Sequence, residues 1–479
     1  MGEFKKNSTI TPIEESMSQW YSDVCLKAEL MDYSRTKGFI IYRPYGFAIW
    51  ENIKNWLDKE FKKTGIQNVY MPSLIPESLF NLEKEHVEGF APECAIVTTG
   101  GNKELDEKLI IRPTSETLFC DHFKNVLNSY RDLPLLYNQW CNVVRWEKTT
   151  RPFLRGKEFL WQEGHTVHET EKEAREETLK MLEIYRSMGE NLFAFPFVCG
   201  RKTEKEKFAG AVETYTIEAL MPDGQALQSG TSHYFGQGFC EKFGVKFLGK
   251  DNKIEYPYQT SFGVSTRLIG SIIMMHGDDN GLVLPPAIAP IQVVIVTVKD
   301  EKVPELKDYA RGLKAKLEEM GVRVKYDETD RTPGWKYAEY EMKGVPVRVS
   351  VGPRDRENGV LEVVYRYNGE KVSIPEEEFI NSIHDIFKTI HQGMYNKAQK
   401  YLNEHIYEVH TYDELKDVLS NGRGYAKMMW DGTREVEDKI KEEFNASSRC
   451  MPFDQTPFGD VDPVSGRKAK YVCLFARSY

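Results

Sequence analysis

The sequence predicts an α+β protein of several domains, in which an antiparallel sheet forms the first domain and a compact α/β domain follows it. Three observations support this fold class. Between residues 193 and 284, short apolar segments alternate with glycine-rich turns, a pattern typical of antiparallel strands. The composition changes at Leu284-Pro-Pro-Ala-Ile-Ala-Pro290, which indicates a linker. Beyond this linker, strand and helix patterns alternate, as they do in an α/β domain.

The first domain is expected to span residues 1–284 and to begin with a helix and a strand end. Apolar side chains recur at helical spacing between Pro44 and Phe61, and Gly65 supplies a stop signal. Val69-Tyr70-Met71, which precedes a proline, indicates the end of a strand. Residues 169–190 have the charge and apolar pattern of a second helix.

Two apolar segments, Cys141 to Val144 and Phe159 to Trp161, flank a short cationic turn and predict a β-hairpin. The hairpin carries guanidinium groups, aromatic rings and carboxylates within one segment that ends at His165. Guanidinium groups suit phosphate oxygens, and a carboxylate accepts hydrogen bonds from an amine. The segment therefore predicts a surface for a nucleotide and a small amine.

The second domain is expected to span residues 285–395 as a compact α/β unit. The third, residues 396–479, is expected to be a small domain of mixed helix and strand. Strands separated by helices favour a sheet that those helices cover. The expected elements of the second domain, in chain order, are strand Ile291–Val298, helix 303–320, strand Val322–Tyr326, helix 335–343, strand Val345–Val351, strand Val360–Arg366 and helix 375–391.

The 479-residue chain has 41% hydrophobic and 29% charged residues and a net charge of −9. These values are ordinary for a soluble globular protein. They exclude a wholly basic nucleic-acid coat and allow a local cationic groove. No two of the eight cysteines form a CxxC pair, which favours reduced thiols in a cytoplasmic protein. The apolar stretch Gly281 to Val298 contains three prolines, so no membrane segment is expected.

Several common catalytic motifs are absent. Neither a GxxxxGK[ST] phosphate loop nor a GxGxxG dinucleotide turn occurs. His165, His168 and Glu169 follow the order HxxHE, which differs from the HExxH of zinc proteases, so no metal site is expected there. No serine or cysteine lies in a nucleophile elbow. The chemistry is therefore expected to need no covalent protein nucleophile.

Taken in order, several segments resemble the motifs of class II aminoacyl-tRNA synthetases, most closely those of the prolyl-tRNA synthetase family of the archaeal/eukaryotic type. The helix and strand end before Pro72 are similar to motif 1, which builds the dimer interface in that class. Arg145 to His165 is similar to motif 2. The other matches are Arg112-Pro-Thr-Ser-Glu116 (amine-binding loop), Gln228-Ser-Gly-Thr-Ser-His233 (second substrate loop), and Gly263-Val-Ser-Thr-Arg-Leu-Ile-Gly270 with Gly281-Leu-Val-Leu-Pro-Pro286 (motif 3).

The resemblance implies a class II catalytic domain on an antiparallel sheet, an α/β anticodon-binding domain and a small α/β C-terminal domain. It implies a ligase that activates L-proline with ATP and Mg²⁺ and transfers the prolyl group to the 3′ end of tRNA(Pro). It further implies a cytoplasmic homodimer without a membrane or DNA partner. About 100 residues separate His165 from Gly263, too few for the large editing insertion of bacterial-type relatives.

The family's functional residues carry over onto three groups of positions. Arg145 and Arg267 are the expected catalytic residues. The expected proline-binding residues are Thr114, Glu116, Arg145, Trp161, Glu163, His165, Phe208 and His233. The expected ATP-binding residues are Arg145, Glu147, Arg155, Gly156, Phe159, Gln228, Thr231, Ser265 and Arg267. The residues expected to meet anticodon bases are Glu341, Arg348 and Arg354.

In the implied reaction the proline carboxylate attacks the α-phosphorus of ATP, so positioning and electrostatic stabilisation should dominate. The resemblance assigns Arg145 to that phosphate and to the proline carboxylate, and Arg155 to the terminal phosphates. Phe159 and Arg267 would lie on the two faces of adenine. Glu116 would pair with the cationic ring amine.

Each of these residues also has a purely structural explanation. Arg145 could pair with Glu147 on the surface, Phe159 could be a core aromatic, and Glu116 could stabilise a helix start. The anticodon residues could line the solvated edge of a sheet. The order and spacing of five matching segments favour the functional explanation.

The chain departs from the family in its third domain. Many members of this type carry four zinc-binding cysteines there. In this chain the first pair is replaced near Asp431 and Val436 and the second near Asp462 to Ser465, which leaves Cys450 and Cys473. Two thiolates do not make a four-ligand site, so no structural zinc is expected.

Two other functions stay open on the residues alone. A sibling synthetase of the same subclass would charge threonine, serine, glycine or histidine, but Thr114-Ser115-Glu116 and the Trp161 to His165 segment argue against it. A synthetase-derived tRNA-binding protein without activity should have lost Arg145 or Arg267, and both are present. The family also implies that the terminal Tyr479 folds back toward the catalytic domain.

Overall fold

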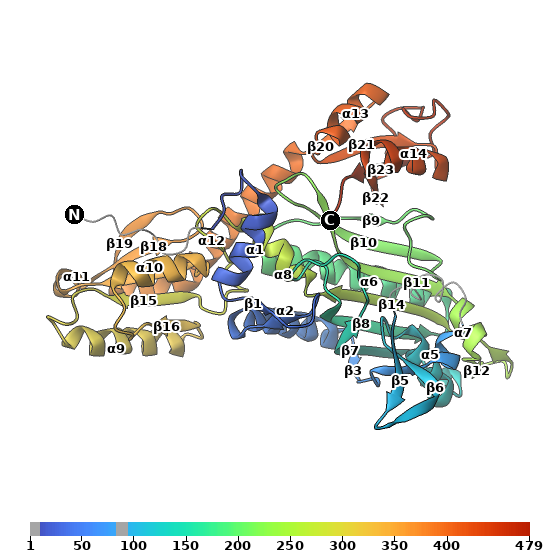
Figure 1. The fold of residues 1–479 in the computed structure, drawn as a ribbon, viewed down its shortest axis with the longest axis horizontal. Coiled ribbons are helices and arrows are strands. Elements are labelled where there is room, and N and C mark those ends of the chain that lie inside the picture. The colour runs from blue at the N-terminus through green and yellow to red at the C-terminus, as the bar shows by residue number, and fades with distance from the viewer. Residues whose placement is uncertain (1–9, 83–93) are drawn as a thin grey trace.

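The structure, a computed structural model, describes residues 10–82 and 94–479 (Figure 1). An eleven-stranded sheet runs through the described part of the molecule, in the order β20-β21-β23-β22-β9-β10-β11-β14-β8-β7-β3. Its strands are β3 (Gln67–Asn68), β7 (Leu135–Val144), β8 (Glu158–His168), β9 (Val198–Arg201), β10 (Glu213–Leu220), β11 (Ala226–Gly236), β14 (Tyr258–Ser265), β20 (Ile406–Val409), β21 (Tyr425–Trp430), β22 (Ser447–Pro452) and β23 (Tyr471–Ala476).

Apolar helix faces pack against this sheet and form the largest hydrophobic core. The helices of this part are α1 (Met17–Lys27), α2 (Pro44–Lys63), α6 (Glu171–Met188) and α8 (Arg267–His276). Thr170 and Glu173 form a capping box at the start of α6, and Met181 and Tyr185 lie on its buried side. Both long helices predicted from the sequence are confirmed, with ends that differ by at most two residues.

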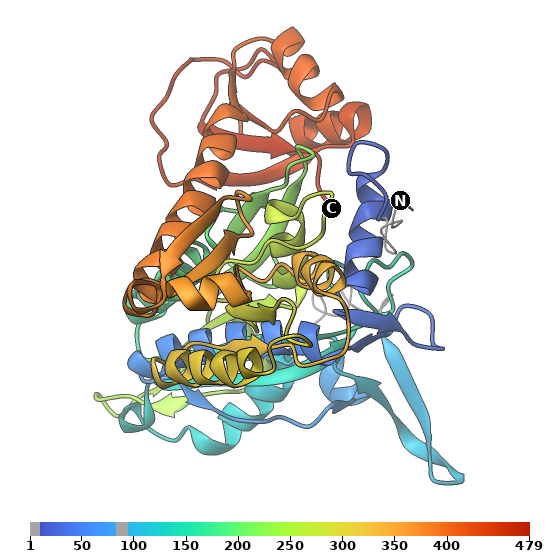
Figure 2. The ribbon, with the colours of Figure 1, turned by 90° about the vertical axis from the view of Figure 1, so that its left-hand side faces the viewer.

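Smaller elements surround the sheet. Figure 2 shows the hairpin of β5 (Ala95–Gly100) and β6 (Lys103–Ile111) projecting away from the rest of the molecule. The other elements that the structure describes before residue 284 are β1 (Met31–Tyr33), β2 (Ile40–Tyr42), β4 (Leu74–Pro76), α3 (Glu77–Phe80), α5 (Glu116–Val126), the 3₁₀-helix η2 (Tyr130–Asp132), the π-helix η3 (Gly189–Phe193), α7 (Gly238–Phe243), β12 (Phe247–Leu248) and β13 (Ile254–Glu255). No helix in the described ranges is both long and apolar enough to cross a membrane.

One predicted strand end is wrong in position. β3 stops at Asn68, so Val69 to Met71 lies outside it. The Met71 N–H donates to the side chain of Gln139 at 2.9 Å and makes no strand hydrogen bond. A side-chain acceptor therefore satisfies the backbone there.

The second sheet, in the order β16-β15-β17-β18-β19, lies after residue 290 with its own hydrophobic core. The predicted alternation of strand and helix is confirmed, whereas β19 and α11 were not predicted. Helix α12 also continues beyond residue 391. The elements are β15 (Val293–Thr297), α9 (Glu305–Glu319), β16 (Val324–Tyr326), α10 (Pro333–Met342), β17 (Val347–Val351), α11 (Pro353–Asn358), β18 (Val360–Tyr365), β19 (Lys371–Pro375) and α12 (Glu376–Glu404).

The last part of the chain adds α13 (Tyr412–Ser420) and α14 (Arg434–Phe444), with a third core beneath them. Its strands extend the main sheet because Met451 and Pro452 of β22 pair with β9. At this junction the carboxylate of Glu218 contacts Lys202 Nζ at 2.7 Å and Arg449 Nη2 at 3.0 Å. All three side chains are buried. Burial would raise the pKa of Glu218, but Arg449 and Lys202 hold it below its usual range.

The buried ion group predicts a stability effect. Glu218→Gln should lower the free energy of unfolding by about 3–5 kcal/mol, because two buried cations lose their carboxylate. Urea-induced unfolding measures it. Glu328→Gln is the matched control, since its carboxylate pairs with Arg311 on the surface and should leave the unfolding midpoint nearly unchanged. Equal midpoints for both variants would contradict the prediction.

Candidate active site

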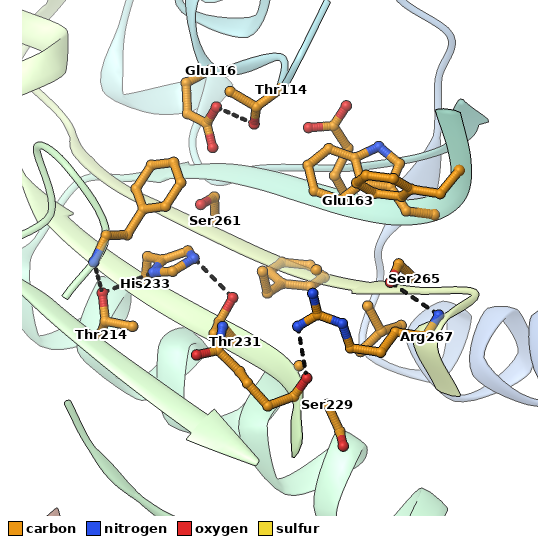
Figure 3. A pocket seen from close by; sticks show the side chains of 18 of the residues that line it. Thr114, Glu116, Glu163, Thr214, Ser229, Thr231, His233, Ser261, Ser265 and Arg267 are labelled. Carbon is orange, nitrogen blue, oxygen red and sulfur yellow. Dashed lines mark hydrogen bonds between the residues drawn. The ribbon is translucent and has the colours of Figure 1, made fainter. Parts of the chain in front are cut away.

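A cavity of about 230 Å³ opens on the face of the main sheet (Figure 3). Side chains of β8 line it at every second position, because alternate residues of a strand point to the same face. Phe159, Trp161, Glu163 and His165 are these residues. The segment Thr114 to Glu116 and residues of β10, β11 and β14 complete the wall.

Strand register sets which residues meet across the cavity. His165 of β8 lies opposite Ser261 of β14. On the other side of Ser261 lies His233 of β11, and His233 in turn lies opposite Thr214 of β10. One row of side chains therefore crosses four strands. Thr231 and Glu163 lie in the adjacent row, on either side of Gly263.

Thr114 and Glu116 form the acidic end of the cavity. Both are buried, and the Thr114 hydroxyl donates to Glu116 Oε2 at 2.5 Å. Arg112 fixes the start of this loop, since its guanidinium donates to Met71 O at 2.6 Å and to Asn142 O at 2.9 Å. Arg112 is thus a structural anchor of the loop.

His233 is held between two threonines. The Phe208 N–H donates to Thr214 Oγ1 at 3.0 Å, so the Thr214 hydroxyl can donate to His233 Nδ1, 2.9 Å away. His233 Nε2 then donates to Thr231 Oγ1 at 3.0 Å. Burial, together with His165, lowers the pKa of His233 to about 3. His233 is therefore neutral at physiological pH and adds no charge to the cavity.

Two guanidinium groups form the cationic end. Arg145 follows β7, donates through Nε to Pro113 O at 2.9 Å, and lies 5.4 Å from the ring centre of Phe159. Arg267 begins α8 and donates to the backbone oxygens of Leu154 and Gln228. Burial, Arg155 and Arg145 lower the pKa of Arg267 to about 10. An anion between these cations would relieve their repulsion.

Other predicted nucleotide residues lie beside this end. Gln228, Thr231 and Ser265 line the cavity, and Ser265 Oγ accepts the Arg267 N–H at 3.2 Å. Arg155 and Gly156 line an adjoining cavity that also reaches Phe159. Glu147 lies 3.7 Å from Arg155. The structure therefore places Glu147, Arg155 and Gly156 outside the main cavity, in the hairpin loop next to it.

Two of the three predicted anticodon residues line the same cavity, and the third lies outside it. Glu341 of α10 and Arg348 of β17 line a cavity of about 110 Å³. The Arg348 guanidinium lies 3.7 Å from the ring centre of Tyr337. Arg354 is exposed on α11 and does not line that cavity.

Sequence reasoning missed several residues that line the main cavity: Glu206, Thr214, Ser229, Gly230 and Ser261. Strand periodicity could have indicated Ser261, since it lies two residues before Gly263 and four before Ser265. Thr214 could not be found that way, because its place depends on the register of β10 against β11.

The terminal Tyr479 folds back onto the first domain, as expected. Its N–H donates to Ala226 O at 3.1 Å and its hydroxyl donates to Asp223. The guanidinium of Arg151, in the hairpin loop, lies 5.3 Å from the Tyr479 ring centre. The chain end therefore contacts the part of the loop that precedes Arg155.

Comparison with known proteins agrees with this geometry. Residues 97–276 match the class II tRNA synthetase core domain (G, H, P, S and T), residues 292–386 an anticodon-binding domain, and residues 412–479 the C-terminal domain of prolyl-tRNA synthetase. The chain is 53% identical to proline–tRNA ligase from Lachnospira eligens, with all of both chains covered. It is 54% identical to that of Lachnoclostridium phytofermentans and 53% to that of Clostridium botulinum, with 98% of each chain covered. The chain therefore belongs to the prolyl-tRNA synthetase family of class II aminoacyl-tRNA synthetases.

Proposed function

We propose that this chain is a proline–tRNA ligase, which joins L-proline to ATP as prolyl-adenylate and then transfers the prolyl group to tRNA(Pro). One observation carries the proposal: a single cavity has carboxylate and hydroxyl groups at one end and two guanidinium groups at the other. A zwitterionic amino acid and a triphosphate need such opposite ends. Membership of the family and relatives named proline–tRNA ligase support it.

Proline would bind with its ring amine toward Glu116 and Thr114 and its carboxylate toward Arg145. A cationic amine gains a charge-assisted hydrogen bond from a carboxylate. The pyrrolidine ring would lie among the remaining proline-binding residues, which are Trp161, Glu163, His165, Phe208 and His233. A neutral His233 suits this role, because the pyrrolidine ring offers no negative charge with which a charged imidazolium could pair.

ATP would bind at the cationic end, with adenine between Phe159 and Arg267. Gln228, Thr231 and Ser265 would contact the ribose and the phosphates, and the hairpin loop residues Glu147, Arg155 and Gly156 would approach the terminal phosphates. Mg²⁺ would enter with the triphosphate. The described residues contain no group of three or more metal-ligating side chains, so phosphate oxygens and water would supply most of its ligands.

Catalysis would follow from positioning and charge. Arg145 belongs to the cationic end and donates to Pro113 O, next to Thr114 of the acidic end, so it can hold the proline carboxylate and the α-phosphate in line. Arg145 and Arg267 would then stabilise the negative charge that develops on the pentavalent phosphorus. This assignment makes them the catalytic residues, and no protein nucleophile is needed.

The domain assignment of the proposal is residues 1–284 for catalysis, 285–395 for the anticodon and 396–479 for the C-terminal domain. The second limit falls within α12, which runs unbroken to Glu404. The short segment between His165 and Gly263 and the matched C-terminal domain support the archaeal/eukaryotic type of architecture, although the named relatives are bacterial.

The active form would be a homodimer in the cytoplasm, without membrane or DNA partners. Motif 1, which would form the dimer interface, comprises α2 and the segment at Tyr70. The apolar side chains Ile41, Tyr70 and Ile96 are 54%, 67% and 51% exposed. A second copy of the chain would cover side chains of this kind.

The C-terminal domain would hold no structural zinc, because a network of hydrogen bonds occupies the expected positions. Asp431 accepts from Ser465 Oγ at 2.8 Å and from Arg467 Nε at 2.7 Å. Asp462 accepts three backbone N–H groups, including that of Asp431 at 2.9 Å. These bonds tie the two loops together as a metal would.

The activity has a direct test. ATP–pyrophosphate exchange, assayed with each of the twenty amino acids, should respond most to proline. Alanine should give a weaker signal, because each missing methylene is worth roughly 1–3 kcal/mol. Arg145→Ala should reduce exchange by roughly 10²- to 10³-fold, whereas Arg131→Ala, on the exposed surface, should not. A stronger response to threonine, serine, glycine or histidine would refute the proposal, as would no response at all.

A second test concerns the anticodon. Arginine forks read guanine edges, and the family places Glu341, Arg348 and Arg354 at anticodon bases. Arg354→Ala should weaken aminoacylation of tRNA(Pro) roughly 10- to 100-fold and leave proline-dependent exchange unchanged. Arg356→Ala, an exposed neighbour on α11, is the matched control. An equal loss in both reactions would contradict the assignment.

A further inference from the structure

Gln139 lies in the middle of β7, directly opposite Glu163, and is fully buried. Its amide group has one possible orientation. The Oε1 atom accepts the Met71 N–H at 2.9 Å, so Nε2 must face the opposite way. There it donates to Glu163 Oε1 at 2.6 Å and to Ser115 Oγ at 3.0 Å.

Ser115 carries this connection to the loop at the acidic end of the cavity. It lies between Thr114 and Glu116, and its hydroxyl donates to Glu163 Oε1 at 2.5 Å. The preceding Pro113 O accepts from Arg145 Nε. The loop is therefore attached to β8 through Ser115 and to the cationic end through Pro113.

Glu163 is occupied by these neighbours. Its Oε1 accepts from Ser115 and Gln139, and its Oε2 contacts His165 Nε2 at 2.9 Å. Burial would raise the pKa of Glu163, but the hydrogen bonds with His165, Ser115 and Gln139 keep it low. His165 is in turn stacked on Phe119, with ring centres 4.1 Å apart. The carboxylate therefore orients His165 and has little capacity left for a ligand.

We propose that Gln139 is a positioning residue for the amino-acid substrate. Through Ser115 and Glu163 it sets the distance between the amine-binding loop and the β8 side chains around the proline ring. The inference rests on the proposed function and deepens it. It should act on proline more than on ATP, because Gln139 contacts Ser115 of the loop and Glu163 directly, whereas its connection to Arg145 of the cationic end runs through Pro113.

The test is steady-state ATP–pyrophosphate exchange with Gln139→Met, which keeps the volume and removes the hydrogen bonds. The KM for proline should rise roughly 10- to 100-fold, as expected when hydrogen bonds to a charged group are lost. The KM for ATP should change far less than the KM for proline. Ser115→Ala, which removes only one hydroxyl, should change the KM for proline in the same direction by less.

Gln162→Met is the matched control. Gln162 is equally buried and lies on β8, but its side chain points to the opposite face. It donates to Asn138 Oδ1 at 2.8 Å and accepts from Tyr185 Oη at 2.5 Å. The same chemical change should lower thermal stability in both variants, while only Gln139→Met alters the KM for proline.

Gln139→Glu adds a pH-dependent readout. The new carboxyl group would face Glu163 and His165 of β8, Cys141 of β7 and Arg112. Two adjacent carboxylates cannot both ionise easily, so one would bind a proton. That proton can be donated to Glu163 as the amide hydrogen was. The KM of this variant for proline should therefore fall as pH falls from 8 to 6. The pH profiles of the wild type and of Gln162→Glu, which carries the same change on the opposite face of the sheet, are the controls and should not show this fall.

Parallel increases in both KM values for Gln139→Met and Ser115→Ala would overturn the inference, as would a loss of stability without any change in the KM for proline. Either result would leave Gln139 a purely structural residue. A wild-type chain without proline-dependent exchange would instead refute the proposed function, so the two failures are distinguishable.

Discussion

Strand β8 is hydrogen-bonded on both sides, to β7 and to β14, and the active-site geometry depends on its register. Its odd-numbered residues face the cavity, whereas the even-numbered ones face the helices. Gln162 reaches Tyr185 of α6 on that second face. Gly164 leaves room for Phe262, since a Cβ there would lie 2.0 Å from the ring. A slip of one residue would exchange the two faces, so the helix packing that fixes the register also fixes the site.

The sequence was most informative where a pattern is local. The hairpin of β7 and β8 was predictable because two apolar runs flank one turn, and the helices α2 and α6 because their apolar faces repeat every three or four residues. The order of motifs then indicated most of the residues predicted to bind substrate in the main cavity, but it missed others that line it, such as Thr214 and Ser261. Arg145, Glu163 and His165 were identifiable in this way, although nothing in the sequence indicates how they contact one another.

The other features could not be predicted, because they depend on the pairing of strands that lie far apart in the sequence. The joining of β22 to β9 connects segments far apart in the chain, so the single sheet that spans the first and last parts could not be read from local patterns. The ion group of Glu218, Lys202 and Arg449 has the same origin. Val69 to Met71 resembles a strand by composition, but the side chain of Gln139 takes the hydrogen bond that a strand would have made.

The two buried carboxylates on strands β8 and β10 of the main sheet differ in how their charge is balanced. Glu218 is paired with two cations, so its charge is cancelled within the junction that it stabilises. Glu163 is stabilised by its contact with His165 and by hydrogen bonds from Ser115 and Gln139, of which the last two are neutral donors. Neutral donors lower the pKa of a carboxylate without cancelling its charge.

The separation of carboxylates from guanidinium groups gives the cavity its polarity. The Thr114 to Glu116 loop adds a second carboxylate beside Glu163, while Arg145 and Arg267 lie at the other end. In a buried site such opposed charges act strongly on a bound dipole. A zwitterionic amino acid would therefore be oriented before any specific contact forms, with its amine toward the carboxylates and its own carboxylate toward the arginines. The residues that hold Glu163 in its charged form, which are His165, Ser115 and Gln139, thus contribute to the direction in which the substrate binds.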